Sequence, residues 1–184
     1  MQPTLSTLKY ITLSLLLVLA ACGGDTAEQQ PVPKKVRKDK ANKESMVEIN
    51  KRVTEAEALQ IDKYITRHGL AVTQTPTGLR YVIYKKAPGK PPMPKKDQKV
   101  LIHFTTLLLD GKEVYNSRTG QPVQVIIDHD NVESGVHEGL KYMHVGDKAK
   151  FILPSHLAHG IVGDNDKIPP LTPVVYDIEL LSIQ

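Results

Sequence analysis

The last third of the chain narrows the possible folds more than any other stretch. Residues 148–153 and 174–183 both alternate apolar with polar side chains, and the segment between them contains several glycines and prolines. Alternation with a period of two is typical of a strand that buries one face, and glycine and proline are typical of turns and loops. The pattern predicts two antiparallel strands joined by an irregular loop.

The region before this stretch carries further strand signals. Segments rich in β-branched, aromatic or aliphatic residues predict strands at 77–84, 100–109, 112–115 and 123–127. Asp110-Gly111 stands between the second and third of these segments and is a strong signal for a tight hairpin turn.

One helix is predicted among these strands, starting near Asp130-Asn131, because both residues are suitable N-caps. Four apolar residues then share one helical face: Val132, Val136, Leu140 and Met143. Gly135 and Gly139 lie four residues apart and would let this helix approach a sheet closely. The fold class predicted from these elements is α+β, an antiparallel β-sheet wrapped on one short α-helix.

An N-terminal helix is predicted at residues 44–69. Met46, Ile49, Val53 and Ala56 recur at helical steps, and Gly69 is a suitable stop signal. Its apolar stripe could pack against the chain's own domain or pair with a second copy. The heptad fails at Gln60, so we favour packing, and we expect a monomer or a weak dimer.

Residues 1–21 have the pattern of a bacterial lipoprotein signal peptide. Lys9 precedes the apolar run 11–20, and Leu19-Ala-Ala-Cys22 contains the only cysteine of the chain. An ordinary secretory peptide and a signal anchor are the alternatives. Residues 22–43 are polar and basic, and we interpret them as a flexible linker. If Cys22 is lipidated, the expected location is the bacterial cell envelope, anchored in the outer membrane and facing the periplasm.

The C-terminal motifs together resemble the FK506-binding (FKBP-type) peptidyl-prolyl cis-trans isomerases. The likeness rests on the Val145-Gly146 turn, on Pro154-Ser-His-Leu-Ala-His-Gly160, on Ile168-Pro-Pro170 and on the closing strand. It covers residues 77–184. Within the family, four motifs are most similar to the lipoprotein FKBPs associated with gliding motility in Bacteroidetes: Tyr115-Asn-Ser117, Lys141-Tyr-Met-His144, Pro154-Ser-His156 and Gly163-Asp-Asn165.

The resemblance implies an FKBP-like fold and the rotation of X-Pro bonds in exported, proline-containing polypeptides. Twisting an amide removes its resonance, and the barrier is about 18–20 kcal/mol. The twisted carbonyl has lost its charge-separated form, so an apolar hollow suits it better than water does. Such a mechanism requires no nucleophile, metal or cofactor.

Carried over position by position, the resemblance implies a pocket and a rim. The pocket residues are Phe104, Val132, Glu133, Val136, His159, Ile168 and Tyr176. The rim residues are Val114, Tyr115 and Val123. Glu133 stands where the family has an isoleucine whose backbone N–H donates to the substrate.

Several of these positions depart from the family pattern. Val136 replaces a tryptophan floor, Val123 replaces a phenylalanine, and Val114-Tyr115 replaces Phe-Asp. His159 replaces a tyrosine whose hydroxyl binds ligands. Weak or altered activity is therefore expected, and the alternative is a noncatalytic FKBP-fold chaperone or peptide-binding adaptor.

Other functional classes have little support. His156 and His159 lie three residues apart, but no carboxylate or cysteine completes a metal site at helical spacing. Asp164-Asn165-Asp166 lacks the rest of a calcium loop. The export signal and the scarcity of aromatic residues argue against nucleic-acid binding.

Overall fold

The computed structural model describes the backbone of residues 36–184 and the side chains of residues 45–184. The predicted signal peptide, Cys22 and the first part of the predicted linker lie outside the described residues. The elements, in chain order, are α1 (Val36–His68), β1 (Thr73–Gln74), β2 (Arg80–Lys85), β3 (Lys99–Leu108), β4 (Glu113–Asn116), β5 (Val123–Ile126), α2 (Ser134–Leu140), β6 (Lys148–Leu153), the 3-10 helix η1 (Ser155–Leu157) and β7 (Val174–Ile183).

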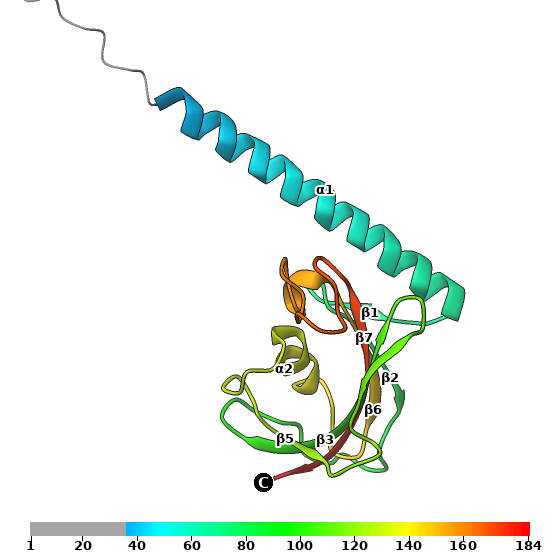
Figure 1. Ribbon diagram of the computed structural model, residues 1–184. Coiled ribbons are helices and arrows are strands. Elements are labelled where there is room, and N and C mark those ends of the chain that lie inside the picture. Colours follow the sequence, from blue (N-terminus) through cyan, green and yellow to red (C-terminus); the bar gives the residue numbers. More distant parts are fainter. Residues whose placement is uncertain (1–35) are drawn as a thin grey trace, which may run out of the picture.

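The strands form one antiparallel sheet that curves around α2 (Figure 1). The strand order is β1-β2-β6-β7-β3-β4, and β5 pairs with the first part of β3. The longest pairing joins β3 to β7 and brings Phe104 opposite Ile178. The predicted α+β fold, a sheet wrapped on one short helix with an N-terminal helix outside it, is confirmed.

The core lies between the concave face of the sheet and α2. Phe151, Leu140 and Ile178 are fully buried there. A Cβ added at Gly139 would lie 2.4 Å from a ring carbon of Phe151, and one added at Gly135 would lie 2.4 Å from Leu153 Cδ2. These two glycines therefore set how closely α2 approaches the sheet, as the sequence predicted.

Helix α2 begins later than predicted. Its first residue is Ser134 and its N-cap is Glu133, so Asp130 and Asn131 precede it in an irregular loop. The Asp130 carboxylate instead accepts the backbone N–H of Ile126 at 2.7 Å. An aspartate side chain can cap a helix or accept a backbone hydrogen bond within a turn. Asp130 does the second, in the turn after β5.

Helix α1 begins at Val36, eight residues before the predicted start at Glu44, so residues 36–43 belong to the helix and not to a linker. Residues 36–43 contain no glycine or proline and are mostly good helix formers, so nothing in them stops a helix. No helix of the described residues is both long and apolar enough to cross a membrane.

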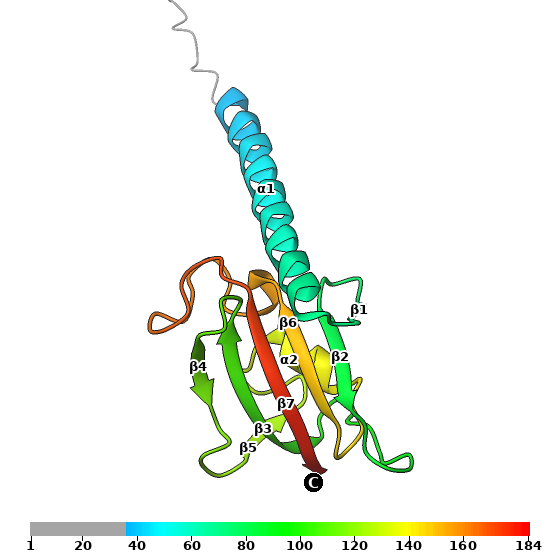
Figure 2. The ribbon, with the colours of Figure 1, turned by 90° about the vertical axis from the view of Figure 1, so that its right-hand side faces the viewer.

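The two halves of α1 differ in their contacts. Ile61 and Tyr64 are buried against Ile152 and Val175 on the outer face of the sheet. The first half extends away from the domain (Figures 1 and 2), and Ile49 there is 47% exposed. The prediction that the stripe packs against the chain's own domain therefore holds for the second half. Ile49 faces Ile161 and Leu171 of the domain only across an open hollow.

Candidate functional site

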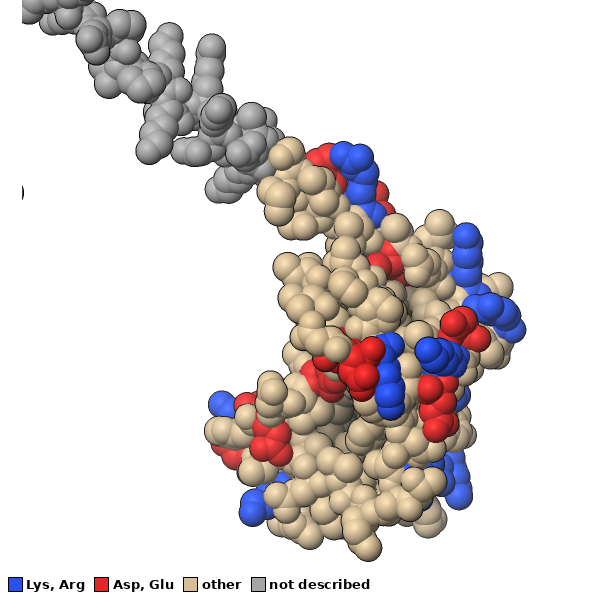
Figure 3. Space-filling model, in the orientation of Figure 1, with Lys and Arg blue, Asp and Glu red and all other residues tan. Residues whose placement is uncertain are grey.

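A hollow of about 440 Å³ opens between α2 and the concave face of the sheet. Strands β3, β4, β5 and β7, the loop before α2, and the loop after η1 all contribute to its wall. Figure 3 shows the face of the domain that Figure 1 presents, hollowed near its middle with acidic side chains beside the hollow.

Eight of the ten residues predicted from the sequence line this hollow. They are Phe104, Tyr115, Val123, Val132, Glu133, Val136, His159 and Tyr176. They come from positions that are up to 72 residues apart, and the curvature of the sheet around α2 brings them together.

Val114 and Ile168 do not line the hollow. Their side chains belong to the core and are 4% and 2% exposed. Successive side chains of a strand point to opposite faces, so Val114 cannot share the position of Tyr115 on β4. Ile168 lies inward of its loop, and its backbone N–H donates to the Asp164 carboxylate at 2.8 Å.

Sequence reasoning missed seven residues of the lining. They are Ile102, Asn116, Ser117, Gln124, Val125, Asp130 and Asn131. Period-two spacing could have found Ile102 from Phe104 and Val125 from Val123, because residues two apart share a strand face. Ser117 lies two residues after Tyr115 but beyond the predicted strand at 112–115. Its hydroxyl oxygen accepts a hydrogen bond from the Phe104 N–H at 2.8 Å, which joins the end of β4 to β3.

The apolar part of the hollow has a floor and an aromatic wall. Val136 of α2 forms the floor and is 1% exposed. The rings of Phe104 and Tyr176 lie 5.8 Å apart between centroids at an interplanar angle of 47°. Apolar side chains thus enclose the inner part of the hollow.

A polar cluster lies beside this wall. The Tyr176 hydroxyl donates to Glu133 Oε1 at 2.7 Å. Nε2 of His159 lies 2.9 Å from the same oxygen. That contact is close but not an aligned hydrogen bond, so His159 Nε2 is buried without an aligned hydrogen-bond partner.

Burial, and then the charge of the adjacent Glu133, raise the pKa of Tyr176 well above its usual value. The Tyr176 hydroxyl therefore stays protonated at neutral pH and acts as a donor. Glu133 accepts this hydrogen bond and lies close to His159, so a hydroxyl, a carboxylate and an imidazole meet at the edge of an apolar space.

The loop at residues 164–167 is fixed against β4. The Tyr115 hydroxyl donates to the Asp164 carboxylate, and Lys167 Nζ lies 4.8 Å from the centroid of the Tyr115 ring. The hydrogen bond to Asp164, followed by desolvation, raises the pKa of Tyr115 to about 12. Desolvation opposes ionisation of Asp164, but its hydrogen bonds from Tyr115, Ile168 and Asp166 win and lower its pKa to about 2.

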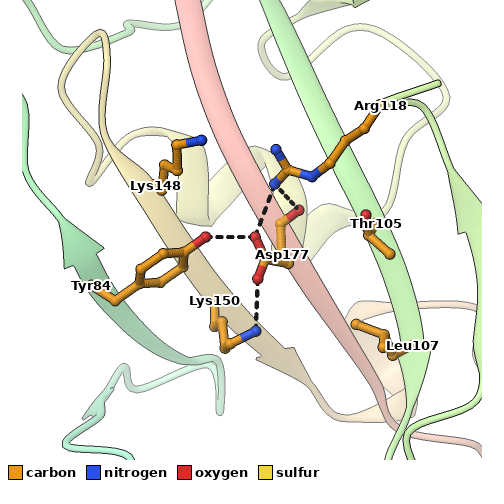
Figure 4. A pocket seen from close by; sticks show the side chains of 7 residues that line it. All are labelled: Tyr84, Thr105, Leu107, Arg118, Lys148, Lys150 and Asp177. Carbon is orange, nitrogen blue, oxygen red and sulfur yellow. Dashed lines mark hydrogen bonds and ion pairs between the residues drawn. The ribbon is translucent and has the colours of Figure 1, made fainter. Parts of the chain in front are cut away.

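A second hollow, of about 390 Å³, lies on the outer face of the sheet (Figure 4). Asp177 at its centre accepts hydrogen bonds from Tyr84 at 2.7 Å, Lys150 at 2.7 Å and Arg118 at 2.9 Å. Lys148 pairs with Glu179 at 2.7 Å. The charged groups here satisfy one another, which is typical of an ion-pair network across strands rather than of a site that awaits a ligand.

The two histidines considered as metal ligands diverge. His156 is exposed and its Nε2 lies 3.0 Å from the carbonyl oxygen of Thr77, whereas His159 lines the first hollow. Among the described residues, no three side chains of the types that bind metals are grouped closely enough to hold an ion.

Comparison with known proteins agrees with this geometry. Residues 90–181 match the family model of the FKBP-type peptidyl-prolyl cis-trans isomerases. The FKBP-type isomerase FkpA of Escherichia coli K12 is 36% identical over 124 residues, which are 67% of this chain and 43% of that protein. FkpA of Buchnera aphidicola subsp. Schizaphis graminum is 30% identical over 151 residues, or 82% of this chain and 54% of that protein.

Solved structures share the fold. The crystal structure of E. coli FkpA has a TM-score of 0.62 and 31% identity, and the match covers 80% of this chain and 68% of that chain. A peptidyl-prolyl cis-trans isomerase from Pseudomonas syringae pv. tomato has a TM-score of 0.62 and 28% identity, over 73% of this chain and 95% of that chain. The chain spans about half the length of the curated relatives that it matches.

Proposed function

The chain belongs to the FKBP-type peptidyl-prolyl cis-trans isomerase family, and we propose that its first hollow catalyses rotation about X-Pro bonds. The observation that carries the proposal is the hollow's apolar floor and aromatic wall, formed by Val136, Phe104 and Tyr176. The substrates that we propose are proline-containing polypeptides exported to the cell envelope.

The mechanism follows from the barrier. A prolyl ring seated on Val136 would leave the preceding amide in a space with little water, where the free-energy gap between the twisted state and the planar, charge-separated one is smaller than in water. Each 1.4 kcal/mol or so of that preference is a factor of ten in rate. We assign the backbone N–H of Glu133 as the donor to the substrate carbonyl, by its place in the family motif. The reaction needs no covalent step.

The departures at Glu133 and His159 alter the edge of the hollow and leave its floor apolar. The Glu133 carboxylate accepts the Tyr176 hydroxyl and lies 2.9 Å from His159 Nε2, so the edge of the hollow is polar where the substrate enters. A slower isomerase than relatives with an all-apolar pocket follows from this arrangement, because the carboxylate keeps water near the amide.

A protease-free isomerisation assay on Leu-Pro and Phe-Pro peptides tests the activity. We expect Val136→Arg to abolish it, because a charged side chain would fill the floor of the hollow. Val162→Arg is the matched control: Val162 is 59% exposed and lies outside the lining. Circular dichroism should show both variants folded. Undiminished activity of the folded Val136→Arg variant would mean that the site is elsewhere.

If the folded wild-type chain shows no rate above background, the isomerase proposal fails. The alternative is then a noncatalytic chaperone or peptide-binding adaptor of the same fold, which the departures from the family pattern at Val136, His159 and Tyr115 favour. Binding of the same peptides, measured by fluorescence anisotropy, distinguishes such a protein from a chain with no peptide site.

We also propose that residues 1–21 are a lipoprotein signal and that lipidated Cys22 anchors the protein in the outer membrane, with the isomerase domain at residues 77–184 facing the periplasm. The support is the sequence Leu19-Ala-Ala-Cys22 after an apolar run. Cys22→Ala should move the protein from the membrane fraction to the soluble fraction. Membrane retention of that variant contradicts lipidation.

A subgroup can be proposed as well. Four motifs support a place among the lipoprotein FKBPs associated with gliding motility in Bacteroidetes: Tyr115-Asn-Ser117, Lys141-Tyr-Met-His144, Pro154-Ser-His156 and Gly163-Asp-Asn165. A phylogeny of the family in which the chain groups apart from those lipoproteins would refute the assignment.

A further inference from the structure

Helix α1 carries a buried carboxylate that contacts the catalytic domain. Glu57 is 4% exposed, an uncommon state for a glutamate. Its Oε2 accepts the backbone N–H of Ser155 at 2.8 Å, and its Oε1 accepts the Ser155 hydroxyl at 2.6 Å. The two residues are 98 positions apart in the sequence, so this contact joins α1 to the segment that follows β6.

Ser155 is the hydrogen-bonding centre of that segment. It begins η1, and its carbonyl oxygen accepts the N–H groups of Ala158 at 2.9 Å and Gly160 at 2.8 Å. His159 lies between those two donors and enters the hollow. The Ser155 carbonyl oxygen thus holds the turn that carries His159. The N–H and the hydroxyl of Ser155 both donate to Glu57, which fixes the position of Ser155.

Docking of α1 does not by itself require this carboxylate. Ile61 and Tyr64 already bury the helix against the sheet, and Asp62 lies 3.6 Å from the buried Arg80 guanidinium. Burying a carboxylate costs several kcal/mol in desolvation, and apolar residues often stabilise such a contact as well or better. What a bidentate acceptor supplies beyond docking is a fixed position for its two donors.

We propose that Glu57 is a positioning residue for prolyl isomerisation, which through Ser155 sets the place of His159 in the hollow. The proposal rests on the function assigned above. His159 Nε2 and Glu133 Oε1 lie 2.9 Å apart, so a small displacement of the turn changes both the donor that faces the substrate and the partner of Glu133. The N-terminal helix is then part of the catalytic unit as well as its connection to the preceding chain.

The experiment uses the full-length chain in detergent. Glu57→Ala removes both acceptors, Glu57→Gln keeps one, and Ser155→Ala removes the hydroxyl donor alone. Glu55→Ala is the matched control, because Glu55 is exposed on the same helix. Each variant is measured for kcat and KM on an X-Pro peptide, and for the NMR shifts of the His159 ring and of the amides at residues 158–160.

We expect Glu57→Ala to lower kcat/KM by about tenfold, mainly in kcat, since a misplaced group near the reacting bond can cost up to about 100-fold. The His159 ring signals should shift in the same variant. Glu57→Gln and Ser155→Ala should give smaller changes of the same kind, and Glu55→Ala should give none.

The proposal is overturned if Glu57→Ala lowers the melting temperature but leaves kcat and the His159 ring signals as in wild type. If Glu57→Ala fails to fold, Ser155→Ala and Glu57→Gln decide on the same two readouts. An inactive wild-type chain would defeat the proposed function instead, and the NMR shifts would still show whether Glu57 positions His159.

Discussion

At the scale of single residues, the polar edge of the hollow is built around one carboxylate, that of Glu133. Glu133 stands where an apolar residue is usual in the family, yet it is not a free charge, because Tyr176 donates to it and His159 contacts it. The carboxylate thereby fixes the Tyr176 hydroxyl and lies beside the His159 imidazole, and all three side chains line the hollow whose floor is Val136. An unpartnered carboxylate would be unfavourable in an apolar pocket, but here Glu133 holds the Tyr176 hydroxyl in place at the pocket's edge.

Tyr115→Phe should raise the pKa of Asp164 from about 2 toward the ordinary value near 3.9, because it removes a hydrogen bond to the ionised carboxylate. A carboxyl whose pKa is lowered on folding stabilises the fold above its unfolded pKa and loses that contribution as the pH falls through its folded pKa. The variant should therefore be less stable than wild type at pH 7. The difference should shrink between about pH 4 and pH 2.

The pKa of Asp164 can be followed by carboxyl NMR, and stability by urea unfolding at several pH values. Asn116→Ala is a suitable control: Asn116 is also on β4, and its side-chain amide donates to Glu113 rather than to the loop at residues 164–167. An Asp164 that titrates in Tyr115→Phe as it does in wild type would show that the other hydrogen bonds set its pKa.

At the scale of elements, the strands were predictable wherever one face meets water. Period two predicted β6 and β7, richness in β-branched and aliphatic residues predicted β3, and the spacing of Gly135 and Gly139 predicted the close approach of α2. In β6 and β7 the alternation fails at Ile152 and Val175, which are buried on the outer face. No local pattern could show this, since α1 covers them from a distant part of the sequence.

The residues of the candidate site were predictable where they belong to a sequence motif on a regular element. They were less predictable in loops, where the loop conformation sets the direction of the side chain. The eight pocket residues that the structure brings together come from strands, α2 and the loop before it, and the Gly160 turn. Ile168 was assigned to the hollow but points into the core, because the loop folds around the Asp164 carboxylate. Side-chain directions in such a loop depend on tertiary hydrogen bonds that the sequence does not display.

Ile61→Ala should lower the free energy of unfolding by about 2–5 kcal/mol, because Ile61 is fully buried between α1 and the sheet. Leu59→Ala, on the same helix but 55% exposed, should change it by less than about 0.5 kcal/mol. Urea denaturation followed by far-ultraviolet circular dichroism measures both. Equal effects of the two substitutions would mean that α1 is not packed on the sheet as described.

At the scale of the whole molecule, the protein is a compact domain with a helical arm that is fixed at one end. Glu57, Ile61 and Tyr64 join the second half of α1 to the sheet and to η1. The first half carries exposed apolar side chains at Met46, Val47 and Ile49 and extends beyond the domain (Figure 2). The two halves of α1 thus form one continuous helix, but only the second half has extensive tertiary contacts with the domain.

This inequality predicts a step in amide hydrogen exchange along α1. Helices owe most of their stability in water to packing, so residues 57–68 should exchange slowly and residues 45–53 quickly. Mass spectrometry of peptides from the two halves, at neutral pH and at several protein concentrations, measures the step. If exchange in the first half becomes slower as the protein concentration rises, a second copy covers Met46 and Ile49. Equal and slow exchange at all concentrations would contradict a projecting arm, because the domain itself would then have to protect it.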